Sequence, residues 1–224
     1  MSTPIVHIGI VTFNSLADLP QCFAGIQAQT YPHLRVTVLD NASSDKSAEW
    51  IAENAPETTL IRSTKNLGFG KGHNQIVETL NQGEFYLALN PDVQMHPTYI
   101  ESIVLALMAH PQAACATGKL IQPDGKTLYS VGHAMLQDGF VFNIGHQMPD
   151  DERFNTSREI FIAPGAALII TSQFLSTLPS LFEPVMFMYY EDTDLGWGAR
   201  RQGWINLYVA EATAYHRGGK PNDA

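Results

Sequence analysis

Three carboxylates crowd one short stretch of this chain, and they follow an apolar run. Glu191, Asp192 and Asp194 come after the segment Val185-Met186-Phe187-Met188-Tyr189-Tyr190. Acids placed at the end of a buried segment can have raised pKa values and act as general bases. A solvated first turn of a helix also favours acids, because the helix dipole attracts negative charge. Taken alone, the stretch fits both interpretations.

A second acidic site lies far upstream, where Asn90-Pro91-Asp92 ends an apolar run. A carboxylate in this place suits Mg²⁺ or Mn²⁺ on a diphosphate, since hard cations prefer oxygen ligands and often take only one or two from protein. A turn residue is the alternative interpretation. His216 stands before Arg217-Gly218, where contact with phosphate or metal competes with a purely structural role.

Composition limits the class of protein. The chain has 224 residues, 45% hydrophobic and 16% charged, which predicts an ordinary globular protein with one substantial core. Its net charge of −9 argues against nucleic acid as a partner, because that would need a basic face. Cys22 and Cys115 lie in apolar contexts and are expected to be buried free thiols. With no signal peptide and no run long enough to span a membrane, we expect a cytoplasmic protein that could contact the inner face of the cell membrane.

The elements that must position these acids alternate between strand and helix. Strands are predicted at 5–13, 34–40, 58–62 and 85–90, and helices at 16–29, 47–54, 72–81 and 97–110. Pro20 should delay the first regular helix to about Leu19. This alternation predicts an α/β fold, with a mostly parallel sheet and helices on both faces.

The second half of the chain has weaker periodicity. We expect a loop or hairpin region at 130–159, a bend and buried strand at 161–170, a helix at 192–202, and short strands at 205–209 and 213–216. One domain spanning 1–224 is the simplest organisation. Within it, residues 1–119 would form a nucleotide-binding half and residues 120–224 an acceptor and catalytic half.

Polar residues recur where the predicted strands end, and ligands bind at that edge of parallel sheets. Asp40 could accept a hydrogen bond from a base imide or a ribose hydroxyl, although it also fits a turn before a helix. The glycine-rich stretch 66–74 permits close approach by a ligand, or else is a flexible connection. It matches neither the P-loop nor the dinucleotide-binding pattern. The residues concerned are Asn14, Asp40, Asn66, Asn90 and Asp92.

Five motifs in this order resemble the family 2 glycosyltransferases of GT-A fold, particularly the bacterial rhamnosyltransferase-like branch. They span most of the chain, and their order in suitable strand contexts makes the combination specific. The motifs are Val11-Thr12-Phe13-Asn14, Leu39-Asp40-Asn41-Ala42-Ser43-Ser44-Asp45, Asn66-Leu67-Gly68-Phe69-Gly70, Leu89-Asn90-Pro91-Asp92-Val93 and Glu191-Asp192-Thr193-Asp194-Leu195.

The resemblance implies an inverting, metal-dependent transfer in bacterial cell-surface polysaccharide synthesis. The donor would be a dTDP- or UDP-sugar and the acceptor a glycan or lipid-linked glycan, with Mg²⁺ or Mn²⁺ as the cofactor. Asp192 matches the catalytic base, and Asp92 with His216 matches the metal site. Asn90 stands at the first position of the family's D-x-D-like motif in place of Asp, and Asn-Pro-Asp is a familiar variant in the rhamnosyltransferase-like branch. The remaining implied contacts are Thr12, Phe13, Asn14, Asp40, Asn66, Gly68 and Asn90 for the donor, and Glu191, Asp194 and Trp197 for the acceptor.

Two other functions stay open. A sugar nucleotidyltransferase would need a basic, glycine-rich signature after the first strand, and Val11-Thr12-Phe13-Asn14-Ser15 lacks one. A non-catalytic module that binds a sugar nucleotide or acts as a scaffold would keep Asp40 and Asp92 but need no base at Asp192.

Overall fold

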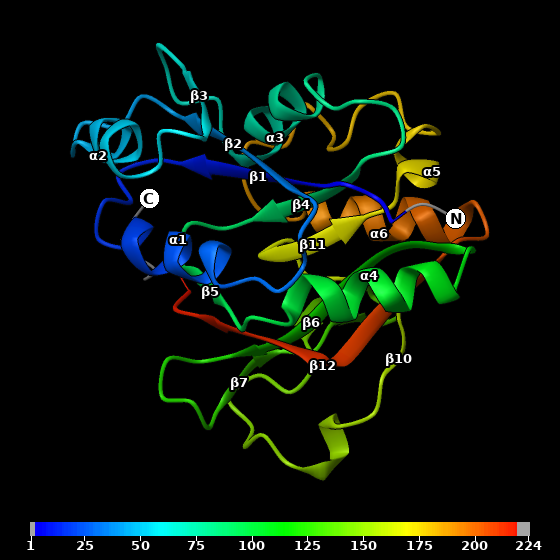
Figure 1. The fold of residues 1–224 in the computed structure, drawn as a ribbon. Helices are drawn as coiled ribbons and strands as arrows, with labels where there is room; N and C mark the ends of the chain where they lie inside the picture. Colours follow the sequence, from blue (N-terminus) through cyan, green and yellow to red (C-terminus); the bar gives the residue numbers. More distant parts are fainter. Residues whose placement is uncertain (1–2, 219–224) are drawn as a thin grey trace.

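A parallel four-stranded core occupies the first half of the chain in this computed structural model, which describes residues 3–218 (Figure 1). Its strands pair in the order β4-β1-β2-β3. Continuous β-branched and apolar runs form such strands because both faces of the sheet are covered. The predicted parallel arrangement is confirmed, with bounds β1 Val6–Thr12, β2 Leu34–Asp40, β3 Thr59–Arg62 and β4 Phe85–Leu89.

The second half extends this sheet beyond β4. In order come β11 (Ala167–Ile170), β6 (Ala113–Ile121), β12 (Ile205–His216) and β10 (Arg158–Ile160). β11 runs antiparallel to β4 and β6, while β12 is parallel to β6. Two short strands join at the sides: β5 (Val93–Met95) pairs with β12, and β7 (Leu128–Ser130) pairs with β6.

Two strands of the second half differ from what the sequence predicts. β6 was not predicted, because its first residues are small and carry little β-branched signal, yet all nine of its residues are buried. β12 is one strand of twelve residues rather than two short ones. A register shift between Val209 and Thr213 absorbs the irregularity that looked like a break in the sequence. The boundary proposed after residue 119 falls inside β6, and the division into halves stays a prediction.

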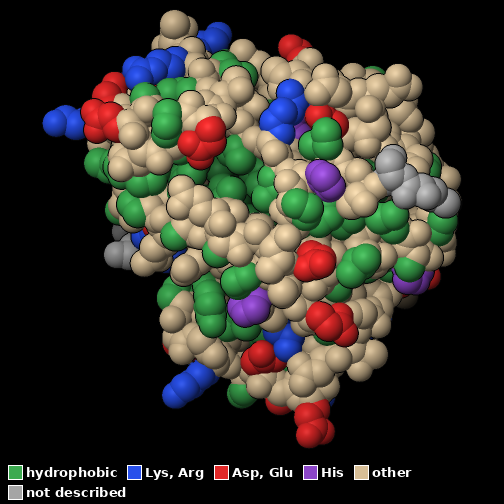
Figure 2. Space-filling model, in the orientation of Figure 1, with side chains coloured by type: hydrophobic (Ala, Val, Ile, Leu, Met, Phe, Trp, Pro, Cys, Tyr) green, Lys and Arg blue, Asp and Glu red, His purple; other side chains and the backbone are tan. Residues whose placement is uncertain are grey.

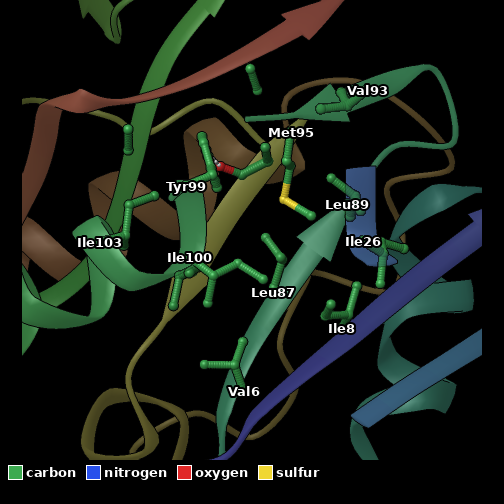
Figure 3. Close-up of a cluster of buried hydrophobic side chains, with 14 of the residues drawn as sticks. Val6, Ile8, Ile26, Leu87, Leu89, Val93, Met95, Tyr99, Ile100 and Ile103 are labelled. Carbon is green, nitrogen blue, oxygen red and sulfur yellow. Dashed lines mark hydrogen bonds between the residues drawn. The ribbon is translucent and has the colours of Figure 1, made fainter. Parts of the chain in front are cut away.

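Helices cover both faces of the sheet (Figure 1). One buried cluster gathers side chains from α1 (Leu19–Gln27), α2 (Ser47–Asn54) and α4 (Tyr99–Ala109). The other gathers them from α3 (Phe69–Val77), α5 (Ser172–Leu175) and α6 (Glu191–Arg201). Figure 3 shows Ile8 and Leu87 of the sheet facing Ile100 of α4 in the first cluster. Each such fully buried side chain contributes about 1.5–3 kcal/mol to holding the helices on the sheet.

The bounds of the helices follow local signals except at α3. The first helix starts at Leu19 with Pro20 in its first turn, as expected. α3 was predicted at 72–81 but runs from Phe69 to Val77. Gly68, with φ of 80°, precedes its first turn, so the helix begins inside the glycine-rich stretch. After Val77 the chain tightens into a turn in which the Thr79 N–H donates to the Ile76 carbonyl.

The stretch 130–159 contains the predicted hairpin, formed by β8 (His133–Met135) and β9 (Val141–Asn143). Cys22 and Cys115 are buried free thiols, as expected. None of the helices within residues 3–218 is both long and apolar enough to cross a membrane. On the face drawn in Figure 2, basic side chains are scattered among acidic ones and form no broad basic field.

Candidate active site

Two buried oxygens at the carboxyl ends of β1 and β2 lack hydrogen-bond partners. Thr12 and Asp40 are register neighbours on these strands, 0% and 4% exposed. Among the described residues, Thr12 Oγ1 and Asp40 Oδ1 contact no donor or acceptor, although Asp40 Oδ2 accepts the Ser43 N–H at 3.3 Å. Buried polar atoms are normally paired, so an orphaned carboxylate oxygen beside a free hydroxyl suits a ligand that offers hydrogen-bond donors.

Asn14 holds the loop after β2 against the end of β1. Its φ of 50° places it in the left-handed region. Its N–H donates to Ser43 Oγ at 3.0 Å, and its Oδ1 accepts the Ser44 N–H at 2.8 Å. The Asn14 side chain therefore ties this loop to the end of β1, whereas the neighbouring Phe13 is 46% exposed.

Asn66 and Gly68 sit where the chain enters α3, next to the end of β2. Asn66 Oδ1 accepts hydrogen bonds from Asn41 Nδ2 and the Gly68 N–H, both at 2.9 Å. A Cβ on Gly68 would lie 2.2 Å from the Phe187 carbonyl oxygen, and the Phe69 N–H donates to that oxygen at 2.8 Å. This glycine therefore lets the segment that leads into α6 dock on the loop that contains Asn66.

Asp92 and His216 form a buried pair at the far side of the same edge. His216 ends β12 beside Val93, and its Nε2 lies 3.3 Å from Asp92 Oδ1. Burial raises the pKa of Asp92, but the hydrogen bond and charge of His216, with the charge of Arg217, outweigh it and hold the pKa below its usual value. Asp92 and Arg217 also line a cavity of about 340 Å³.

The chemistry of this pair fits a divalent cation. Asp92 offers a carboxylate oxygen and His216 an imidazole nitrogen, and 3.3 Å lets both reach one ion. No group of three or more acids, histidines or cysteines within residues 3–218 could hold a metal unaided. The remaining ligands would come from a diphosphate and water, as is common for cations that stay partly hydrated.

Asp192 lies in the first turn of α6 and is tied to the loop that holds Asn90 and Asp92. Its Oδ2 accepts the Gly165 N–H at 2.8 Å, and the next carbonyl, that of Ala166, accepts the Asn90 N–H at 2.8 Å. Burial raises the pKa of Tyr129, and the charges of both Asp92 and Asp192 raise it further. Both distant acids are therefore near enough to Tyr129 for their charges to act on it.

The other predicted acceptor residues occupy different surroundings. Glu191 is buried and its Oε2 has no hydrogen-bond partner in the described part of the chain. Asp194 is exposed in the same turn. Trp197 is 43% exposed, packs edge-on against Phe161, and lines an outer cavity of about 480 Å³ with the arginines that end α6.

Replacement of Glu191 by glutamine should flatten the pH dependence of stability. Burial first, and then the charge of Asp192, raise the pKa of Glu191 from 4.5 to about 7. Because the folded state holds this proton more tightly than the unfolded chain, the contribution of Glu191 to stability is most favourable below pH 4.5 and falls as pH rises towards 7. Between pH 5 and pH 8 the free energy of unfolding should fall by about 2–3 kcal/mol from this group. Urea unfolding at pH 5 and pH 8 measures it.

The neutral Glu191→Gln side chain cannot ionise, so its free energy of unfolding should change less between the two pH values. The exposed Asp194→Asn serves as the matched control and should keep the wild-type difference. An equal change in the free energy of unfolding between pH 5 and pH 8 for wild type and Glu191→Gln would show that Glu191 does not cause the pH dependence.

Three neighbours of the acids were not predicted from the sequence. His133 lies in the stretch read only as a loop or hairpin, and nothing in its spacing links it to Asp192. Tyr129 packs its ring 4.1 Å from the His216 ring, between centroids. Gly165 stands in the predicted bend before β11, which was a usable signal, because a bend beside a buried strand exposes a backbone N–H.

A sheet with this parallel core, this polar carboxyl edge and helices on both faces is the GT-A fold of glycosyltransferases. The chain belongs to glycosyl transferase family 2, whose family model matches residues 7–172. The resemblance inferred from the five sequence motifs is thereby confirmed.

Relatives and solved structures agree with this assignment. An N-acetylglucosaminyl-diphospho-decaprenol L-rhamnosyltransferase of Mycobacterium tuberculosis is 25% identical over 236 residues, covering 96% of this chain and 76% of its own. A structure of GalNAc-T7 with UDP, GalNAc and Mn²⁺ superposes with a TM-score of 0.75 at 13% identity, over 98% of this chain and 45% of that one. Mannosyltransferase PcManGT from Pyrobaculum calidifontis, with GDP-Man and Mn²⁺, gives 0.73 at 17% identity, over 99% and 59%.

Proposed function

We propose that this protein is an inverting glycosyltransferase that moves a sugar from a nucleoside-diphosphate sugar to an acceptor hydroxyl. One observation carries the proposal. The orphaned oxygens of Thr12 and Asp40 lie at the same sheet edge as the Asp92–His216 pair, and the tethered Asp192 adjoins the loop of that pair. Such a transfer requires three parts: a site for the nucleobase, a site for the diphosphate, and a carboxylate that serves as the general base.

The donor would lie along the carboxyl edge of the parallel strands. Asp40 Oδ1 would accept the imide N–H of a thymine or uracil base, with Thr12 and Phe13 beside the ring. The loop containing Asn66 and Gly68 would approach the donor through its backbone. Asn14 would hold the loop beside the base. Asn90 would adjoin the sugar, because its N–H donates to the Ala166 carbonyl and the preceding residue, Gly165, binds Asp192.

Asp92 and His216 would hold Mg²⁺ or Mn²⁺ on the diphosphate. When bound there, the cation offsets the negative charge that grows on the leaving nucleoside diphosphate. The structures of GalNAc-T7 and PcManGT were each solved with Mn²⁺, which supports a cation of this class.

Asp192 would act as the general base. Its carboxylate takes the proton of the acceptor hydroxyl as that oxygen forms a bond to the anomeric carbon. The bond from the anomeric carbon to the phosphate oxygen breaks, and its electron pair leaves with the nucleoside diphosphate. A single displacement by an oxygen opposite the leaving group inverts the configuration, and a positioned base contributes about 10²–10⁴-fold to such a step.

The acceptor is proposed to be a lipid-linked glycan of bacterial cell-surface polysaccharide synthesis. The mycobacterial relative is named for an N-acetylglucosaminyl-diphospho-decaprenol acceptor. Large apolar side chains are exposed on two segments, the hairpin β8–β9, whose first residue His133 lies beside Asp192, and the run before α6. They are Leu136, Phe140, Phe142, Val185, Phe187, Met188, Tyr189 and Tyr190. Aromatic and apolar side chains of this kind suit a lipid chain or the membrane interface, which favours a cytoplasmic protein at the inner face of the membrane.

Within this proposal the two halves of the chain have different tasks. Residues 1–119 would bind the nucleotide, and residues 120–224 would bring the acceptor and the base. Glu191 and Asp194 flank Asp192 and would orient acceptor hydroxyls, and Trp197 offers an exposed ring face to a sugar.

A panel of nucleotides with and without Mn²⁺ tests the donor half of the proposal. At about one hundred times the dissociation constant, a pyrimidine nucleoside diphosphate with Mn²⁺ should stabilise the fold by about 2.7 kcal/mol, or about 5–10 °C in melting temperature. Asp40→Ala should abolish most of this shift. The exposed Glu53→Gln in α2 should keep it.

Transfer is then measured from dTDP-L-rhamnose and UDP-sugars to polyprenyl-diphospho-N-acetylglucosamine, with free N-acetylglucosamine for comparison. We expect product of inverted anomeric configuration, and faster transfer to the lipid-linked acceptor. Donor binding without transfer to either acceptor or to water would favour the non-catalytic module, and absence of binding by all nucleotides would refute the proposal.

A further inference from the structure

A histidine lies beside Asp192, and one of its ring nitrogens has no hydrogen-bond partner among the described residues. His133 Nδ1 is 3.8 Å from Asp192 Oδ2, and each side chain is only 15% exposed. Within residues 3–218 this Nδ1 is buried and makes no hydrogen bond. A buried ring nitrogen without a partner costs free energy, so its position next to a carboxylate calls for an explanation.

The backbone fixes where His133 stands. Its N–H donates to the Ile162 carbonyl at 2.9 Å, and the Ile162 N–H returns to the His133 carbonyl at 3.4 Å. A Cβ on Gly196 would lie 3.0 Å from the Ile162 side chain, so Ile162 also packs directly on α6. Upstream, the Ser130 hydroxyl bonds to both backbone groups of Gly132, whose φ is 136°. The backbone of His133 is therefore fixed beside α6 by contacts on both sides of it in the chain.

The two oxygens of Asp192 are not equivalent in these surroundings. Oδ2 accepts the Gly165 N–H at 2.8 Å and faces His133. Oδ1 has only a distant contact from the Thr193 hydroxyl, at 3.4 Å. Oδ2 is thus the anchored oxygen, and Oδ1 is the one left available for a substrate proton.

We propose that His133 is a positioning residue for Asp192. Its Nδ1–H directs Oδ2 and so keeps Oδ1 turned towards the acceptor hydroxyl, in a role that rests on the proposed function of Asp192 as the base. Closing the gap from 3.8 Å to a hydrogen-bond distance of about 3.0 Å needs a shift of less than about 1 Å. A base oriented by a third group is a recurrent arrangement in enzymes.

Three substitutions test the role through the position of one N–H group. Asparagine places its amide near the position of Nδ1, glutamine places it nearer Nε2, and alanine removes it. With dTDP-L-rhamnose and Mn²⁺, His133→Ala and His133→Gln should lower kcat by about 10–100-fold, while His133→Asn stays within about threefold of wild type. The donor KM should not change. Equal rates for His133→Asn and His133→Ala, or wild-type rates for all three, would overturn the proposal.

A spectroscopic measurement needs neither donor nor acceptor. Long-range ¹H–¹⁵N NMR of the histidine rings should place a proton on Nδ1 of His133, with the His133→Asn spectrum giving the assignment. Asp192→Asn should move this resonance, and Asp194→Asn should leave it in place. An unmoved resonance in Asp192→Asn means that the two groups do not interact, and the proposal fails. A moved resonance in a protein that turns over no donor would instead refute the proposed function.

Discussion

Replacement of Asp192 by asparagine should lower kcat by about 10³-fold while donor affinity stays within about twofold. The amide keeps the shape of the side chain and can still accept the Gly165 N–H, so α6 should stay in place. It cannot take a proton from the acceptor hydroxyl. Steady-state turnover gives the first quantity, and calorimetry of the nucleoside diphosphate with Mn²⁺ gives the second.

Glu53→Gln is the charge control, because it removes an exposed carboxylate from α2, a helix that carries none of the proposed acceptor residues. It should retain turnover within about threefold, as surface changes away from special features usually have small effects. Native turnover in Asp192→Asn would show that another group is the base. Glu191 would then be the first candidate, since its buried carboxyl lies in the same turn.

Replacement of Asp92 by alanine should remove the effect of Mn²⁺ on donor binding. In the wild type, Mn²⁺ should strengthen nucleoside-diphosphate binding, and the variant should lose about 10–100-fold of affinity in its presence. Without Mn²⁺ the two proteins should bind alike, because the base pocket at Asp40 is intact. Calorimetric titration with and without Mn²⁺ separates the affinity that depends on the cation from the affinity that does not.

Loss of one carboxylate also changes net charge, so Glu53→Gln in α2 is titrated in parallel and should behave as the wild type. His216→Ala should reduce the Mn²⁺ effect as well, because its Nε2 lies 3.3 Å from Asp92 Oδ1. Undiminished Mn²⁺ dependence in Asp92→Ala would mean that the cation binds elsewhere.

Much of the fold could be predicted because its signals are local. β2 and α2 appear with the predicted bounds, and α1 starts at Leu19 where Pro20 fits its first turn. Apolar runs of strand length and prolines at helix starts act through neighbouring residues alone. The same reasoning missed β6, whose run of small residues becomes a strand only because β11 and β12 flank it.

The sequence by itself determined the parallel core, the polar residues at its edge and the family, because strand periodicity and ordered motifs are properties of the chain. Only the tertiary structure decided which of those residues meet. Asp192 reaches the Asn90 loop through Gly165 and Ala166. His133 reaches Asp192 because Ile162 pairs with His133 and packs against Gly196, which lies on the same helix as Asp192. Such contacts join residues far apart in the chain, and no spacing within the sequence encodes them.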